Sequence, residues 1–240
     1  MNQQFAGKLN GKQKAIGFIL LIPIYMHIAP MFIQAGLYLY IKYVQSLDRY
    51  TINILLNFFI AVVIFVFEIV VFKDFLIENI KKFKEKILDN ITWSLTAGIG
   101  VMYAISMITN IVISSFLGHA NTSSNQLLFE SLLGKGLILM IIQSVILAPI
   151  VEEVIFRGLI FRTLRDYNKY MAHFVSALCF GFIHIYSGLF AGDLTQLFYL
   201  LSYGGSGLAF SYAYEARKTI VAPIIIHMVN NLIAVIVLCL

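Results

Sequence analysis

Charged residues are scarce in this sequence. They make up 12% of its 240 residues, whereas hydrophobic residues make up 60% and the mean hydropathy is +0.87. A soluble globular domain has about 25% charged residues. The chain therefore has too little polar material to cover a surface that faces water, and we expect a polytopic membrane protein.

Three further absences narrow the class of protein. The two cysteines, Cys179 and Cys239, lie within apolar runs and give neither a zinc-binding spacing nor a disulfide framework. Strands of outer-membrane proteins alternate apolar and polar residues over about ten positions, and this sequence lacks such segments. It has unbroken apolar runs of about twenty residues, which predict helices. The net charge is +5, but the basic residues lie in short segments between apolar runs, so we expect no nucleic-acid binding.

Seven apolar runs predict an all-α transmembrane bundle. They fall near residues 15 to 41, 52 to 72, 91 to 117, 136 to 161, 170 to 190, 194 to 214 and 219 to 240. The first is longer than a signal-peptide core and lacks a small-residue cleavage site, so we interpret it as a retained span. Residues 73–90 mix apolar residues with lysines, which predicts an amphipathic helix on the cytoplasmic membrane surface.

Charge between the runs predicts the orientation in the membrane. With the amino end in the cytoplasm, thirteen basic residues lie inside and three lie outside, which places the carboxyl end outside. The abundance of Ile, Phe, Lys and Asn is typical of a bacterial protein, so we expect a multi-pass protein of a bacterial cell membrane. Within this single membrane domain, residues 1–130 supply the N-terminal helices and residues 131–240 the candidate catalytic helices.

Ionisable and polar side chains within the spans mark the candidate site, because each costs about 2.5 to 3.5 kcal/mol to insert. The fourth span holds Glu152, Glu153 and Arg157, the fifth His184, and the seventh His227 and Asn231. Three helices thus deliver polar groups to a similar depth, as a buried active site requires. Glu68, near the inner end of the second span, is instead expected to extend to the lipid headgroups.

Helical spacing predicts how some of these side chains meet. Glu153 and Arg157 are four residues apart and share a face, so they can pair, while Glu152 is turned about 100° away. His227 and Asn231 have the same spacing and can aim two donors at one point, as an oxyanion hole needs. The alternative for the Glu153–Arg157 pair is a purely structural role in helix packing.

The remaining two predictions concern His184 and a Gly-rich stretch. His184 comes from a third helix and can complete a water-binding corner with Glu152, whose desolvated carboxylate suits a general base. The small residues around Gly204 and Gly207 permit close approach of helices.

The order of these motifs resembles a known family. Glu152-Glu153-x-x-x-Arg157, Phe180-x-x-x-His184 and His227-x-x-x-Asn231 resemble the three motifs of the CPBP family of intramembrane proteases. That family includes type II CAAX prenyl proteases and the bacterial Abi and bacteriocin-processing proteins. The resemblance covers about residues 136 to 240.

The resemblance implies roles for these residues. Glu152 would activate water with help from His184, Glu153 and Arg157 would keep the site ordered, and His227 and Asn231 would stabilise the tetrahedral oxyanion. In the alternative assignment, Glu152, Glu153, His184 and His227 bind zinc. We favour the glutamate mechanism without a cofactor, because the sequence has no HExxH helix and no thiolate cluster.

The expected partners are the lipid bilayer and a membrane-associated peptide or protein substrate. Two other functions stay open at this point. The chain could be a non-catalytic immunity or scaffold protein of the same family, or a transporter that uses the buried carboxylates as a proton relay. The absence of inverted repeats of broken helices argues against the transporter.

Overall fold

The computed structural model describes residues 4–44, 46–118 and 122–240, and every element in these ranges is helical. In chain order the elements are α1 (Gly11–Ile16), η1 (Gly17–Leu21), η2 (Ile24–Ile28), α2 (Ala29–Tyr43), α3 (Arg49–Val71), α4 (Lys73–Lys84), α5 (Ile87–Trp93), η3 (Ser94–Gly98), α6 (Ile99–Leu117), α7 (Ser124–Leu133), α8 (Leu137–Ile141), η4 (Ile142–Leu147), α9 (Ala148–Glu153), η5 (Val154–Phe161), α10 (Arg162–Arg165), α11 (Lys169–Phe190), α12 (Gln196–Arg217) and α13 (Val221–Cys239). The η segments are π-helical and run on into their neighbours without a break. The all-α prediction is therefore confirmed.

Six helices of the described part are long and apolar enough to cross a membrane. They are Gly11–Tyr43, Arg49–Val71, Ile87–Leu117, Leu137–Arg165, Lys169–Phe190 and Val221–Cys239. The predicted run at 194 to 214 corresponds to α12, which has 22 residues but is not among the six. Its apolar residues are interrupted by small and polar ones, and it packs within the bundle between α11 and α6.

Polar side chains and unusual backbone angles set the ends of several helices. The Asp48 carboxylate accepts hydrogen bonds from the first backbone N–H groups of α3, and the Asn168 side chain does the same for α11. Gly118 ends α6 with a φ of 78°, and Lys218 ends α12 with a φ of 56°. These signals explain why the chain turns back between successive spans.

The segment predicted as one amphipathic helix over 73–90 is divided in the structure. α4 ends at Lys84, and Lys86 leaves the helical conformation before α5 begins the third span. Phe75 and Phe83 pack against protein and do not face lipid. The buried Asn79 side chain accepts a hydrogen bond from the backbone N–H of Ile220 at 2.8 Å, which ties α4 to the turn between α12 and α13.

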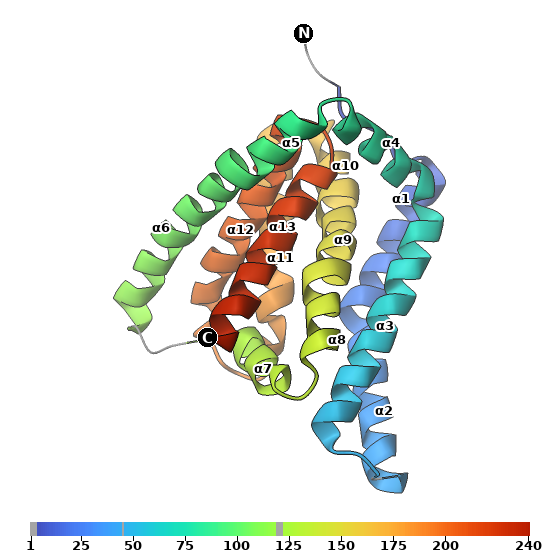
Figure 1. The fold of residues 1–240 in the computed structure, drawn as a ribbon, viewed down its shortest axis with the longest axis vertical. Helices are drawn as coiled ribbons and strands as arrows, with labels where there is room; N and C mark the ends of the chain where they lie inside the picture. Colours follow the sequence, from blue (N-terminus) through green and yellow to red (C-terminus); the bar gives the residue numbers. More distant parts are fainter. Residues whose placement is uncertain (1–3, 45, 119–121) are drawn as a thin grey trace.

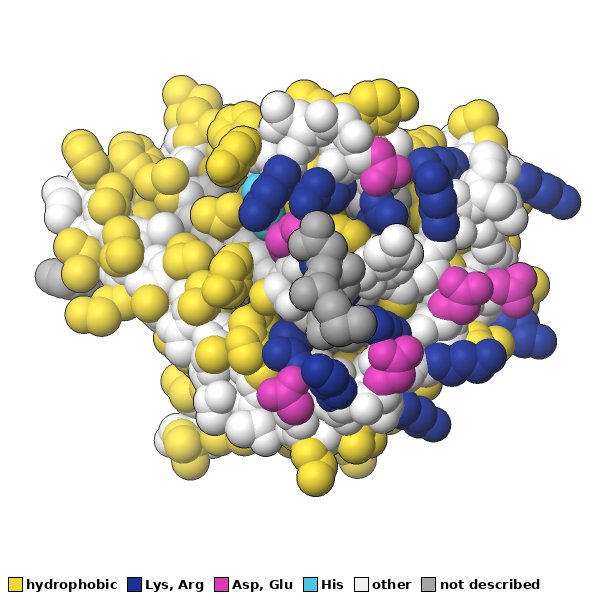
Figure 2. All heavy atoms as spheres, turned by 90° about the horizontal axis from the view of Figure 1, so that it is seen from above, with side chains coloured by type: hydrophobic (Ala, Val, Ile, Leu, Met, Phe, Trp, Pro, Cys, Tyr) yellow, Lys and Arg dark blue, Asp and Glu magenta, His cyan; other side chains and the backbone are white. Residues whose placement is uncertain are grey.

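The bundle has two flanks and a central group of helices. In Figure 1, α2 and α3 lie on one side, α6 lies on the other, and α9, α11, α12 and α13 lie between them. α1 lies near one end of the bundle, and α13 ends toward the other. Figure 2 shows Lys and Arg side chains, with several acidic ones, gathered on the end that carries α4 and α10. The basic inner segments thus share one end, while the orientation in a membrane stays a prediction.

α11 and α12 approach closely through their glycines. A Cβ atom on Gly181 would lie 2.9 Å from the backbone nitrogen of Gly204 and 3.1 Å from its Cα. A Cβ atom on Gly207 would lie 3.0 Å from the Cα of Ala177. The predicted role of the small residues in close helix approach is confirmed.

This close approach gives a first testable prediction. Gly181→Ala should lower the free energy of unfolding by about 1 to 3 kcal/mol, because the new methyl group meets backbone atoms that cannot move aside. Reversible unfolding in mixed detergent micelles would measure the loss. Gly100→Ala in α6 is the matched control, since a Cβ atom there meets nothing within 4 Å. Equal stability of the two variants would contradict the close packing of α11 on α12.

Glu68 does not reach the headgroups, which makes that prediction wrong. Its side chain in α3 is completely buried, and neither carboxylate oxygen has a hydrogen-bond partner among the described residues. Because this side chain has no exposed surface, the face of α3 that carries Glu68 points into the bundle. The position of Glu68 near the end of its span did not reveal that neighbouring helices cover the face of α3 that carries it.

Candidate active site

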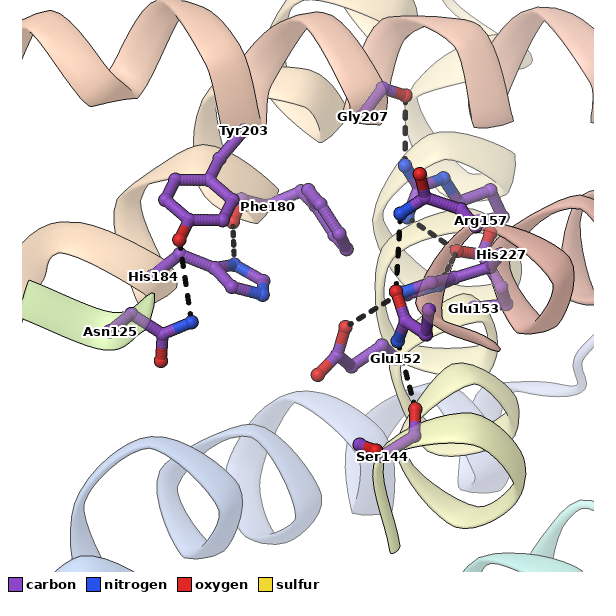
Figure 3. Close-up of polar contacts among 12 residues, drawn as sticks. Asn125, Ser144, Glu152, Glu153, Arg157, Phe180, His184, Tyr203, Gly207 and His227 are labelled. Atoms are coloured by element: carbon purple, nitrogen blue, oxygen red, sulfur yellow. Dashed lines mark hydrogen bonds and ion pairs between the residues drawn. The ribbon is translucent and has the colours of Figure 1, made fainter. Parts of the chain in front are cut away.

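The predicted site residues come from three spans that meet in the middle of the bundle. Glu152 and Glu153 end α9, and Arg157 lies in the π-helical η5 of the same span. His184 comes from α11 and His227 from α13, and Figure 3 shows both side chains on the side of α9 that carries the two glutamates. The predicted convergence of three helices is confirmed.

Glu153 is the centre of a buried ion-pair network. Its Oε1 atom accepts a hydrogen bond from Arg157 at 3.0 Å and contacts Nδ1 of His227, also at 3.0 Å. Arg157 donates a second hydrogen bond to the carbonyl oxygen of Gly207 at 2.8 Å. Glu153 and Arg157 are both completely buried. The pairing expected from the four-residue spacing is confirmed, and it extends to α12 and α13.

Aromatic rings enclose this network. The Arg157 guanidinium lies 4.7 Å from the ring centre of Phe180 and 5.1 Å from that of Phe210, distances at which a cation is attracted to a ring face. Phe210 also stacks on the His227 imidazole, with ring centres 4.6 Å apart. Phe180 of the second motif thus contacts the guanidinium of the first. The rings pack against the guanidinium and the imidazole and help to fix their orientation.

Glu152 lies outside the arginine network, as its angular position on the helix predicted. Its side chain is almost buried, and Oε1 accepts a hydrogen bond from the Tyr25 hydroxyl at 2.6 Å. Its Oε2 atom lies 3.7 Å from Nε2 of His227. Glu152 is therefore a carboxylate that is held at one oxygen and has the other directed toward an imidazole.

His184 faces Glu152 without touching it. Figure 3 shows the imidazole and the Glu152 carboxylate on opposite sides of the same space. Nδ1 of His184 lies 2.9 Å from the carbonyl oxygen of Phe180. Because a carbonyl oxygen only accepts, Nδ1 carries the proton, and Nε2 of the neutral ring is an acceptor. The Tyr203 ring stacks on the imidazole at 4.6 Å, which holds it in this orientation.

Asn231 is engaged elsewhere in this structure. Its Nδ2 donates to the carbonyl oxygen of Ser144 at 2.8 Å, so it does not aim a donor at the same point as His227. The π-helical hydrogen bond from the backbone N–H of Ala148 to Gln143 places the nitrogen of Pro149 next to the Ser144 carbonyl. Proline has no N–H to donate, and Asn231 supplies the missing partner.

The four residues of the zinc alternative are not gathered into a ligand set. Within the ranges that the structure describes, no group of three or more His, Cys, Asp or Glu side chains is placed to hold a metal ion. Glu153 is occupied by Arg157 and His227, and Nδ1 of His184 is bonded to a backbone carbonyl.

The sequence interpretation missed several residues that shape the site. Tyr25, Tyr203 and Phe210 each contact a predicted site residue from another helix. The hydrogen bond from Tyr25 joins residues 127 positions apart, and no local pattern indicates such a contact. The contact between Asn231 and the Ser144 carbonyl did have a local signal. A proline within a span, here Pro149, leaves a carbonyl four or five residues earlier without its usual backbone donor.

Comparisons with known proteins agree with the three motifs. Residues 134–233 match the family described as type II CAAX prenyl endopeptidase Rce1-like. A protein of Bacillus subtilis (strain 168), provisionally named membrane peptidase YdiL, is 37% identical over 99 residues, which cover 41% of this chain and 36% of that protein. The membrane-embedded CAAX protease MroQ of Staphylococcus aureus (strain USA300) is 30% identical over 148 residues, 59% of this chain and 55% of that protein.

The extent of these matches is limited. The chain spans about a third to about half of the length of the two curated relatives. No solved structure matches the chain. The region of similarity nevertheless contains all six predicted site residues, at the ends and centres of the helices described above.

Proposed function

We propose that this chain is a membrane protease of the CPBP family, whose CAAX-type members it resembles over residues 134–233, and that it hydrolyses a peptide bond in a membrane-associated peptide or protein. The observation that carries the proposal is the position of Glu152. It is a nearly buried carboxylate that Arg157 does not neutralise, with one oxygen directed toward His227 and His184 across the same space.

In the proposed mechanism, Glu152 is the general base. A water between Glu152 and His184 donates one proton to Oε2 of Glu152 and directs the other at Nε2 of His184. The water oxygen attacks the carbonyl carbon of the scissile peptide bond, which gives a tetrahedral oxyanion. Glu152 then passes its proton to the leaving amine as the C–N bond breaks. The two products are a carboxylic acid and an amine, and the glutamate returns to its starting state.

His227 is the proposed oxyanion donor. Because the Glu153 carboxylate oxygen only accepts, Nδ1 of His227 is the donor in their contact, and donation to the oxyanion from Nε2 requires a second proton on the ring. In the proposed mechanism Glu153 orients this ring, much as a buried carboxylate orients a catalytic histidine elsewhere. Asn231 joins the oxyanion contacts only if its amide leaves the Ser144 carbonyl.

The proposed substrate class follows from the depth of the site. Glu152 lies near the middle of the span Leu137–Arg165, so a peptide must bring an extended segment into the bundle. A membrane-associated or amphipathic peptide meets this requirement. Whether the substrate carries a prenyl group is a separate question. Pairs of peptides with and without the lipid test it.

The experiment combines substrate and metal dependence. The purified protein is offered fluorogenic amphipathic peptides, each with and without a prenyl group, before and after treatment with a strong chelator. We expect cleavage of at least one peptide and less than a twofold loss of rate after chelation, because Glu152 needs no metal to accept a proton. Loss of all activity on chelation, restored by zinc, would favour the metal assignment. A folded protein that cleaves nothing would favour the non-catalytic immunity or scaffold alternative.

A further inference from the structure

The first span reaches the candidate active site from outside the region that matches the family. Tyr25 lies in η2, and its hydroxyl donates to Oε1 of Glu152 at 2.6 Å. Residues 134–233 carry the family match, so this contact is made by a part of the chain to which no role is assigned. We propose that Tyr25 is the positioning residue that sets the orientation and basicity of Glu152, an inference that rests on the proposed function.

Close packing of the first span against the fourth brings Tyr25 to this position. A Cβ atom on Gly17 would lie 2.5 Å from two side-chain atoms of Leu159, so a side chain at this position would force Leu159 to shift, and glycine accommodates the observed approach of η1 to η5. Tyr25 follows eight residues later, about two helical turns along the same span. The contact at Gly17 therefore holds the two spans close together about two turns from the level where Tyr25 meets Glu152.

The local backbone also turns Tyr25 toward the site. Pro23 precedes η2, and the chain is π-helical from Ile24 to Ile28. A π-helical turn holds more residues than an α-helical turn and rotates the side chains that follow it, and such turns are frequent at functional sites. Tyr25 lies in this segment, so its direction is set by the altered turn and not by regular helical spacing.

The hydrogen bond has two chemical effects on Glu152. Its length is in the range of a charge-assisted O–H···O⁻ bond, which favours the ionised carboxylate. It also occupies Oε1, so Oε2 is the atom that remains directed toward His227 at 3.7 Å. Without the phenol the carboxyl group is free to rotate, and its two oxygens exchange places. Tyr25 thus selects which oxygen accepts the proton from water.

Other ionisable groups surround this pair. They come from every neighbouring span and are Glu68, Glu153, Arg157, His184, Tyr186 and His227. None of them donates to Oε1 of Glu152 within the described residues. A change at the Tyr25 hydroxyl therefore alters one contact of the carboxylate and leaves the charges around it in place.

The test compares two tyrosines whose hydroxyls lie near each other. Tyr25→Phe removes only the hydroxyl that touches Glu152. Tyr186→Phe is the matched control, because its hydroxyl donates to the carbonyl oxygen of Met26, next to Tyr25, at 3.3 Å and does not contact Glu152. Both variants are assayed on the peptide that the wild-type protein cleaves best, and thermal unfolding verifies that both are folded.

We expect Tyr25→Phe to lower kcat about tenfold to a hundredfold with KM within twofold, the effect of losing one hydrogen bond to a charged group. Tyr186→Phe should match the wild-type protein in both kcat and KM. A kcat for Tyr25→Phe that coincides with that of Tyr186→Phe would overturn the positioning role.

A second readout separates this inference from the proposed function. The infrared carboxylate band of Glu152 is identified by its loss in Glu152→Gln, and it does not depend on turnover. We expect this band to shift in Tyr25→Phe and to stay in place in Tyr186→Phe. If the wild-type protein cleaves nothing, the proposed function fails while the band shift still decides the role of Tyr25. If the band does not shift, the positioning role is wrong even in an active protease.

Discussion

Glu152→Gln is expected to lower kcat/KM for peptide cleavage by about 10² to 10⁴, since a positioned general base contributes a factor of this size to the rate. Glutamine keeps the size of the side chain and an oxygen that accepts the Tyr25 hydroxyl, so the packing around Oε1 is preserved. It cannot accept a proton from water. Steady-state kinetics on the best peptide, with a tight-binding assay for the same peptide, would separate lost chemistry from lost binding.

A matched substitution at the surface controls for general effects of removing a carboxylate. Glu130 in α7 is exposed and accepts a hydrogen bond from Gln126 at 2.9 Å, far from the three motifs in sequence. Glu130→Gln should retain the wild-type kcat/KM. If Glu152→Gln retained it too, Glu152 would not be the base, and Glu153 would become the candidate despite its pairing with Arg157.

Arg157→Met is expected to lower the free energy of unfolding by about 3 to 5 kcal/mol. Removing one partner of a buried ion pair leaves the other charge without compensation, which costs far more than the pair itself contributes. Here the loss leaves the Glu153 carboxylate completely buried and removes the hydrogen bond to the Gly207 carbonyl. Unfolding in mixed micelles, followed by the change in helicity, would measure the loss.

The double variant distinguishes an uncompensated charge from a simple packing defect. Glu153→Gln combined with Arg157→Met should be less destabilised than Arg157→Met alone, because no buried charge is then left unpaired. Lys82→Met is the control at the surface, where the pair with Glu85 is exposed and contributes at most about 1 kcal/mol. A double variant that is less stable than Arg157→Met would show that the charge is not the main cause.

Contacts within one helix were the most predictable part of the site. The Glu153–Arg157 pair, the separate direction of Glu152 and the convergence of three spans all follow from helical periodicity and from depth along each apolar run. The close approach of α11 to α12 was visible as a stretch of small residues. These predictions succeeded because residue spacing on a helix fixes angle and height without knowledge of the neighbours.

Contacts between helices were predicted less well. Glu68 was expected at the headgroups and is buried, because the face of α3 that carries it is turned toward neighbouring helices. Asn231 was expected to point with His227 and instead satisfies the carbonyl that Pro149 leaves free. The helix expected over 73–90 ends at Lys84, where the chain turns into the third span. In each case the deciding partner lies on another element.

The sequence by itself determined the membrane class, the helical spans, the uneven distribution of basic charge and the six polar residues of the motifs. Each of these depends on composition or on spacing along a single helix. Only the tertiary structure decided which oxygen of Glu152 is held by Tyr25, that Glu153 joins Arg157 to His227, and where Asn231 donates. Those contacts depend on how whole helices are rotated and how far apart they lie. Close packing at glycines and π-helical turns set this rotation and distance, and the spacing of residues along one helix does not encode them.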